Sequence, residues 1–176
     1  PADMRQVWEA SAAHGDKPYL VFEDETMSYA SAHAAVRSLA HLLVDSHGVR
    51  PGDRVAIMLP NCPQTIISYY ATLSIGGVAG MTNPMYVERE MIHQFNDAGV
   101  KVLVGLDHLF PRIDKVWKET QVEHLVITSI RDYLPFPLNL LYPLKAKKQN
   151  LNMKVPYSGS LHSFKGLLKN SPGNPP

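Results

Sequence analysis

Two asparagines follow apolar runs of this chain, at the places where an α/β protein usually meets its ligand. Asn61 comes shortly after RVAIML at 54–59, and Asn83 comes directly after VAGMT at 78–82. If both runs are parallel strands, their carboxyl ends lie at one edge of the sheet, where such folds bind ligands. Asn is also typical of helix caps and turns, which leaves that structural role open. The candidates for a substrate-side wall are Asn61, Asn83, Pro84 and Tyr86.

The other reactive residues lack the spacing of a catalytic or metal-binding pattern. Cys62 is the only cysteine, and no base lies near it in the sequence to activate its thiol. No two of the eight histidines have the spacing of helical zinc ligands. The glycine cluster at 76–80 precedes a strand, so it is expected to end a helix and not to hold a phosphate. The sequence therefore predicts no catalytic, cofactor-binding or metal-ligating residue.

Alternating strand and helix patterns would position the asparagines. Near-continuous apolar runs, typical of strands covered on both faces, lie at 54–59, 78–82, 101–105 and 124–128. Helical patterns lie between them at 62–75, 87–98 and 107–118. This order predicts an α/β fold with a doubly wound, mostly parallel sheet.

The segments before the first of these strands predict a hairpin and a long helix. The runs at 19–23 and 26–30 flank an acidic turn and form the expected N-terminal hairpin. The clearest helical stripe covers 29–47, and Ser28 is placed to cap it. Two further caps are expected, from Asn61 with Gln64 at capping-box spacing and from Asp107.

Composition and charge divide the chain into two parts. The 45% apolar fraction fits a globular domain, and no apolar run is long enough to span a bilayer. Residues 1–130 carry 10 basic and 15 acidic side chains, a net charge of −5, whereas 131–176 carry 7 and 1, a net charge of +6. We therefore expect an α/β subdomain over 1–132 and a basic, proline-rich, irregular tail over 133–176.

The basic tail suggests an anionic surface as partner. Lys145, Lys147 and Lys148 follow several leucines, and such a mixture suits the headgroup region of a membrane. A solvated tail, or a tail that packs against another part of the protein, explains the same residues. Nucleic acid is not expected, because the aromatic residues of the tail are too dispersed for a stacking platform.

Several short motifs resemble the adenylate-forming, AMP-binding acyl-CoA synthetases, and most closely their long-chain fatty-acid–CoA ligase branch. The general family motifs are MSY at 27–29, GDRVA at 52–56, LPN at 59–61 and LSIGGV at 73–78. The motifs of the fatty-acyl branch are NPMY at 83–86, ERE at 88–90, NDAGVKVLV at 96–104 and YPLKAKKQ at 142–149.

The resemblance implies a two-step reaction. A fatty acid and ATP with Mg would give an acyl-adenylate and pyrophosphate, and CoA would then form the thioester. The family's phosphate loop with its lysine, its ribose-binding aspartate and its C-terminal catalytic lysine have no counterpart in these residues. The resemblance therefore implies an N-terminal portion that needs the remainder of the large domain and is inactive alone. It also implies a cytoplasmic enzyme, and it leaves peripheral membrane contact and a homodimer open.

Two other functions remain open from the sequence. One is a ligase of the same superfamily that acts on aryl acids or other carboxylates, because no substrate-selecting residue is identified. The other is a non-enzymatic α/β ligand-binding module of flavodoxin type. That module would need a phosphate-binding turn after a strand, and none is visible.

Overall fold

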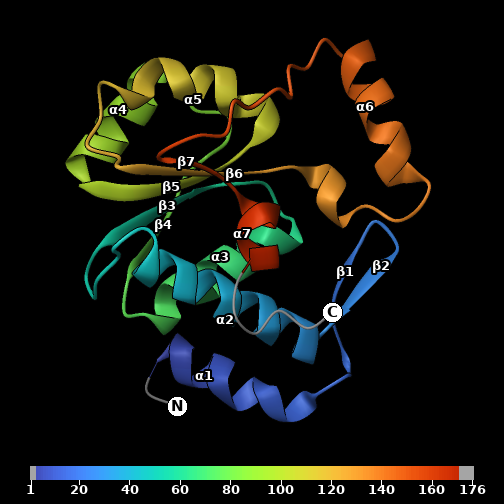
Figure 1. The fold of residues 1–176 in the computed structure, drawn as a ribbon. Coiled ribbons are helices and arrows are strands. Elements are labelled where there is room, and N and C mark those ends of the chain that lie inside the picture. Colours follow the sequence, from blue (N-terminus) through green and yellow to red (C-terminus); the bar gives the residue numbers. More distant parts are fainter. Residues whose placement is uncertain (1–2, 171–176) are drawn as a thin grey trace.

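A five-stranded parallel sheet forms the centre of the molecule in a computed structural model, of which we describe residues 3–170 (Figure 1). Its strands are β3 (Arg54–Met58), β4 (Val78–Met81), β5 (Val100–Leu106), β6 (His124–Thr128) and β7 (Leu161–Ser163). Neighbouring strands are parallel throughout, in the order β4-β3-β5-β6-β7. The predicted parallel sheet is confirmed, and the structure adds a fifth strand.

Helices cover both faces of the sheet. One face carries α4 (Glu88–Asp97) and α5 (Phe110–Trp117), and the other carries α2 (Tyr29–Asp45), α3 (Pro63–Ser74) and α7 (Phe164–Asn170) (Figure 1). The short helix α1 (Met4–Ser11) packs outside this layer, against α3. The predicted antiparallel hairpin is also confirmed, as β1 (Pro18–Phe22) and β2 (Glu25–Ser28).

The core lies between the sheet and its two helical layers. The strands predicted to be covered on both faces include six residues with no exposed surface, because helices cover the sheet on both sides. They are Val55, Ile57, Val102, Val104, Val126 and Ile127.

The predicted helix caps have mixed outcomes. Ser28 caps α2, since its Oγ accepts the backbone amide of Ser31 at 3.2 Å. The prediction for Asn61 is wrong, because α3 begins one residue later and Cys62 occupies the N-cap position. The prediction for Asp107 is also wrong, because α5 begins at Phe110 and Leu109 is its N-cap. Asp107 lies in a 3-10 turn (Asp107–Leu109) before α5, and its carboxylate accepts the amide of His108 at 2.8 Å. A hydrogen bond between a side chain and the backbone of the next residue, such as that of Asp107, competes with capping of the following helix.

The expectation of an irregular tail is wrong for part of the segment after residue 132. Helix α6 (Leu138–Lys148), strand β7 and helix α7 lie within it, while residues 171–176 lie outside the described part of the chain. The division of the chain after residue 132 stays a prediction. None of the described helices is long and apolar enough to cross a bilayer.

Helix α6 continues through a proline because a distant side chain replaces the missing bond. Pro143 has no N–H to donate to the carbonyl of Asn139, one turn earlier. The Nε–H of Arg131 donates to that carbonyl instead, at 2.8 Å. The prolines that predicted irregular structure are therefore compatible with a helix here, through a contact that local sequence patterns do not reveal.

We predict that Val104→Asp prevents stable folding. Val104 lies in the centre of β5 with no exposed surface, and an unpaired carboxylate there costs several kcal/mol against a total stability of about 5–15 kcal/mol. Urea denaturation followed by circular dichroism measures the effect. Val21→Asp is the matched control, since Val21 is also a strand residue but is 71% exposed. Equal denaturation midpoints for the two variants would contradict the buried sheet.

Candidate functional site

The carboxyl ends of the five strands form one edge of the sheet, and that edge is the candidate site. Chain order reverses between β3 and β5, because β4 follows β3 on one side while β5, β6 and β7 lie on the other. Open α/β sheets bind ligands at such a switch point, outside the carboxyl ends of the strands. The segments that leave the sheet there are 59–61 after β3 and 107–109 after β5.

The structure places Asn61 and Asn83 at this edge, after the neighbouring strands β3 and β4. Both side chains are exposed. The Oδ1 of Asn83 accepts the backbone amide of Met85 at 2.9 Å, which is the bond of an Asx turn. Asn83 therefore has a structural role, whereas Asn61 lines a cavity of about 250 Å³ against strand β1.

Pro84 and Tyr86 belong to the same turn after β4. Arg112 of α5 fixes this turn, because its Nη1 donates to the carbonyl oxygen of Tyr86 at 2.6 Å. At the next helix, the amide of Val87 donates to Glu90 Oε2 at 2.8 Å and thus supplies one of the two bonds of a capping box. These contacts hold the turn firmly, which a ligand-facing wall requires.

The hairpin and the edge enclose two cavities on either side of Pro63. The cavity that Asn61 lines is bordered mainly by apolar groups, including Leu20 and Phe22. The second measures about 390 Å³ and reaches Tyr133, whose phenol has a pKa well above its usual value because it is buried. The second cavity is also lined by polar side chains, among them Glu25 and Asp132. Only the cavity beside Asn61 therefore has the mainly apolar wall with a few polar groups that is typical of small-molecule sites.

Gln64 at this edge does not form the capping box that the sequence predicted for it with Asn61. Its side chain has no exposed surface. Its Nε2 donates to Thr128 Oγ1 at 3.2 Å and to the carbonyl of Ser129 at 2.9 Å. The first turn of α3 is thereby tied to the carboxyl end of β6, a contact between segments far apart in the sequence.

The one thiol at this edge, that of Cys62, is unsuited to catalysis. Cys62 is buried, and burial raises the pKa of its thiol although Thr65 hydrogen-bonds it at 3.3 Å. A protonated, enclosed thiol is a poor nucleophile. The glycine cluster at 76–80 follows the end of α3 and leads into the amino end of β4, as expected. Gly76 has a φ of +74°, a backbone conformation that favours glycine. The edge therefore offers hydrogen-bonding groups and apolar walls.

The three lysines predicted to face a membrane lie on the last turn of α6. Lys145, Lys147 and Lys148 are all exposed, and they follow exposed leucines in the first half of the helix. Apolar and basic residues are thus separated along the helix axis. Lysines at a helix C-terminus also complement its dipole, which gives them a structural benefit.

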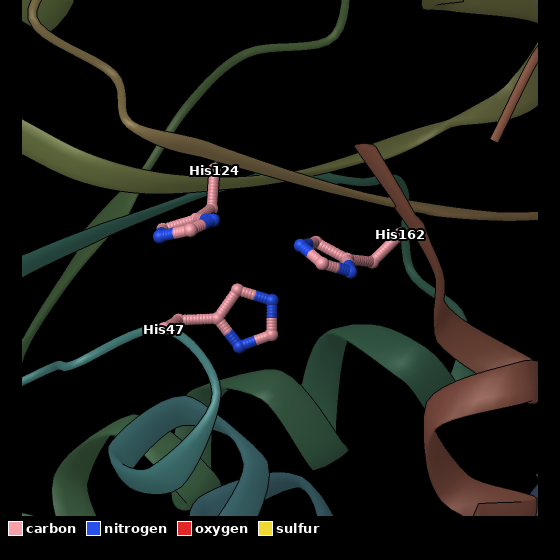
Figure 2. Close-up of side chains that lie close together, drawn as sticks. All are labelled: His47, His124 and His162. Carbon is pink, nitrogen blue, oxygen red and sulfur yellow. The ribbon is translucent and has the colours of Figure 1, made fainter. Parts of the chain in front are cut away.

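A histidine cluster lies at the opposite, amino end of the sheet. His47, His124 and His162 come together there from three distant segments (Figure 2). The search for short ligand spacings could not find it, because each residue comes from a different element. The prediction that the chain has no metal site therefore remains a prediction.

Comparison with known proteins identifies the relatives of this chain. A family model described as AMP-binding enzyme matches residues 7–162. The long-chain-fatty-acid–CoA ligase of Bacillus subtilis (strain 168) is 40% identical over 161 residues, which cover 92% of this chain and 28% of the relative. The ligase of the same name from Salmonella typhimurium is 31% identical over 125 residues, or 71% of this chain and 22% of the relative. The chain therefore spans about a quarter of the length of these relatives.

Solved structures share the fold. The anthranilate CoA ligase AuaEII, in complex with anthranoyl-AMP, matches with a TM-score of 0.75 and 16% identity over 96% of this chain and 28% of its own. The acetoacetyl-CoA synthetase from Streptomyces lividans matches with a TM-score of 0.69 and 20% identity over 94% of this chain and 24% of its own. At these identities the likeness concerns the fold alone.

We predict that Gln64→Ala destabilises the carboxyl edge. The substitution leaves Thr128 and the carbonyl of Ser129 without their donor in a buried place, which costs about 1–3 kcal/mol. The free energy of unfolding, from urea titration, measures this loss. The control Gln121→Ala removes an exposed amide and should change stability by less than about 0.5 kcal/mol. Equal effects would mean that the bonds of Gln64 are unimportant.

Proposed function

The chain belongs to the AMP-binding enzyme family, and on that premise we propose that its protein is a long-chain fatty-acid–CoA ligase. The observation that carries the proposal is the 40% identity to the Bacillus subtilis ligase over 92% of this chain. In the first step, a carboxylate oxygen of the fatty acid attacks the α-phosphorus of ATP, and pyrophosphate leaves. In the second step, the sulfur of CoA attacks the acyl carbon, and AMP leaves.

The part of this chain in the reaction is to build and hold one wall of the site. The segment after β3 supplies the exposed amide of Asn61 beside an apolar cavity, and Gln64 ties that edge to β6. Transition-state stabilisation at phosphorus needs anion-binding loops and cationic side chains aimed at the phosphates. We assign no such catalytic role to any residue of this chain. ATP, Mg and CoA belong to the proposal for the protein at its full natural length.

A ligase for aryl acids is the competing function. Its support is the fold shared with the anthranilate CoA ligase, whose 16% identity is far below that of the fatty-acyl relatives. The cavity beside Asn61 has a mainly apolar lining, which accepts an alkyl chain or a ring. Measuring the reaction with each substrate class in turn separates the two proposals.

We predict that the protein at its full natural length catalyses palmitate-dependent exchange between ATP and pyrophosphate. The 176-residue chain alone should give no exchange above a protein-free control, because we assign no catalytic residue to it. Anthranilate in place of palmitate should support at least about tenfold less exchange, which corresponds to about 1.4 kcal/mol. Higher exchange with anthranilate would favour the aryl-acid function, and exchange by the isolated chain would contradict its assigned role.

Peripheral membrane contact through α6 is a finer part of this proposal. Long-chain fatty acids partition into bilayers, so docking there would bring the enzyme to its substrate. Exposed apolar residues precede the three lysines, and such a combination suits an anionic headgroup region. The apolar residues are Phe136, Leu138, Leu140, Leu141 and Leu144, which are 44–77% exposed. Packing of the same residues against another part of the protein is the alternative.

We predict that joint substitution of Lys145, Lys147 and Lys148 by Gln weakens binding to anionic vesicles. Each lysine near such a surface contributes about 1 kcal/mol, so the loss at low salt should be on the order of a hundredfold. Co-sedimentation with phosphatidylserine vesicles measures it. The control changes three exposed lysines elsewhere, Lys17, Lys118 and Lys169. Unchanged binding of the α6 variant would leave packing against the protein as the role of this surface.

A further inference from the structure

Three histidines converge at the amino end of the sheet, away from the proposed substrate edge (Figure 2). His47 lies in the turn that follows α2, His124 is the first residue of β6, and His162 is the middle residue of β7. In the β6–β7 pairing Val126 lies opposite His162, which puts His124 and His162 on the same face of the sheet. That face also packs against α2, so all three rings enter one space.

The rings lie close enough to share a ligand. One ring nitrogen of each histidine lies within 4.8 Å of the other two. Ring centroids are 4.4 Å apart for His47 and His162, and 4.8 Å apart for His47 and His124. The rings meet nearly edge to face, at 76° and 84°, and this arrangement alone would also suit simple packing.

Hydrogen bonding decides which nitrogen of His47 faces its neighbours. Its Nδ1 lies 2.8 Å from the carbonyl oxygen of Leu42, and a carbonyl can only accept, so Nδ1 carries the proton. The lone pair of the neutral ring is therefore on Nε2. A backbone carbonyl that holds the other ring nitrogen is typical of metal-ligating histidines, because it fixes the tautomer and the ring orientation.

Each ring has a buried nitrogen that no other group in the described part of the chain satisfies. These atoms are His47 Nε2, His124 Nδ1 and His162 Nε2. A buried polar atom without a partner costs about 1–3 kcal/mol, so three of them in one place call for an explanation. A ligand that accepts three lone pairs at once would satisfy all of them.

Local electrostatics keep the three rings neutral, which is the form that binds metals. Burial lowers the pKa of each imidazole, and that of His47 falls to about 4. Glu123 acts on His124 in the opposite sense, and the ammonium of Lys101 adds to the lowering. Asp53 pairs with Lys101 at 3.1 Å and reduces the effect of that cation on a metal ion.

We propose that His47, His124 and His162 bind one Zn²⁺ ion, or a divalent transition metal of similar preference. Imidazole suits Zn²⁺, Ni²⁺ and Cu²⁺, whereas Mg²⁺ prefers oxygen ligands, so the site is separate from the nucleotide's Mg. Tetrahedral Zn²⁺ with bonds of about 2.1 Å needs ligand nitrogens ~3.4 Å apart, which a small inward movement of the rings would provide. Water or an anion would complete the coordination.

The ion would have a structural role. Strand β7 has only three residues and is an outermost strand of the sheet, paired with β6 alone, so few backbone hydrogen bonds hold it. A metal bound by His162 would tie β7 to β6 and to the end of α2 at once. Metal binding of this kind adds its free energy to the folded state. The proposed ligase activity is not involved, and the two proposals can fail independently.

The test measures Zn²⁺ binding by isothermal titration calorimetry with the protein at its full natural length, after removal of metals. We expect one Zn²⁺ per chain at this site and a higher thermal unfolding midpoint with Zn²⁺ present. His162→Gln should lower the affinity at least tenfold and abolish the thermal shift. The control His93→Gln removes an exposed histidine of α4 and should bind as the unchanged protein does.

A second variant and a spectroscopic probe guard against misfolding. His124→Gln removes a different ligand, and circular dichroism checks that both variants fold. Co²⁺ in place of Zn²⁺ should give the intense visible bands of four-coordinate cobalt in the unchanged protein and in His93→Gln, but not in the two ligand variants. Equal Zn²⁺ affinity in all four proteins, or no binding by the unchanged protein, would overturn the proposal and leave the rings as packed neutral side chains.

Discussion

Burial of a parallel sheet on both faces is the constraint on which the rest of this structure depends. Strands β3, β5 and β6 are almost wholly apolar, and helices from both sides exclude water from them. Since all five strands run the same way, every carboxyl end lies at one edge and every amino end at the other. The polar residues next to the strands therefore form two groups: amide side chains at the carboxyl ends and imidazole side chains at the amino ends.

The two ends of the sheet accordingly have different proposed roles. At the carboxyl end, Asn61 lines an apolar cavity and Gln64 fastens α3 to β6. At the amino end, His47, His124 and His162 have three buried nitrogens without partners among residues 3–170. Substrate recognition is proposed for the first end, and a structural metal for the second. A stable attachment of β7 would support the sheet without touching the substrate edge.

The sequence predicted what local patterns encode. Apolar runs located β3 to β6, and Ser28 was recognised as the cap of α2. Strand β7 was missed because the three residues LHS carry no apolar run, and only their pairing with β6 makes them a strand. Helix α6 was missed because Pro143 argued against it, and the bond from Arg131 that compensates comes from an earlier segment.

The candidate site was predictable only in part, for the same reason. Asn61 and Asn83 follow the carboxyl ends of β3 and β4, as the strand pattern indicates, and their contact with a substrate stays a prediction. The burial of Gln64 and the meeting of the three histidines depend on long-range packing, which no spacing rule encodes. The family motifs added the expected activity but assigned no residue of this chain to the chemistry.

Amide hydrogen exchange with a non-hydrolysable palmitoyl-adenylate analogue tests most directly whether the carboxyl edge faces the substrate. The protein at its full natural length is compared with and without the analogue. Slower exchange is expected at 59–61 and 107–109, the segments that leave β3 and β5, with no change at 49–53 before β3. Protection confined to the amino-end segment, with none at the carboxyl edge, would contradict the proposed site.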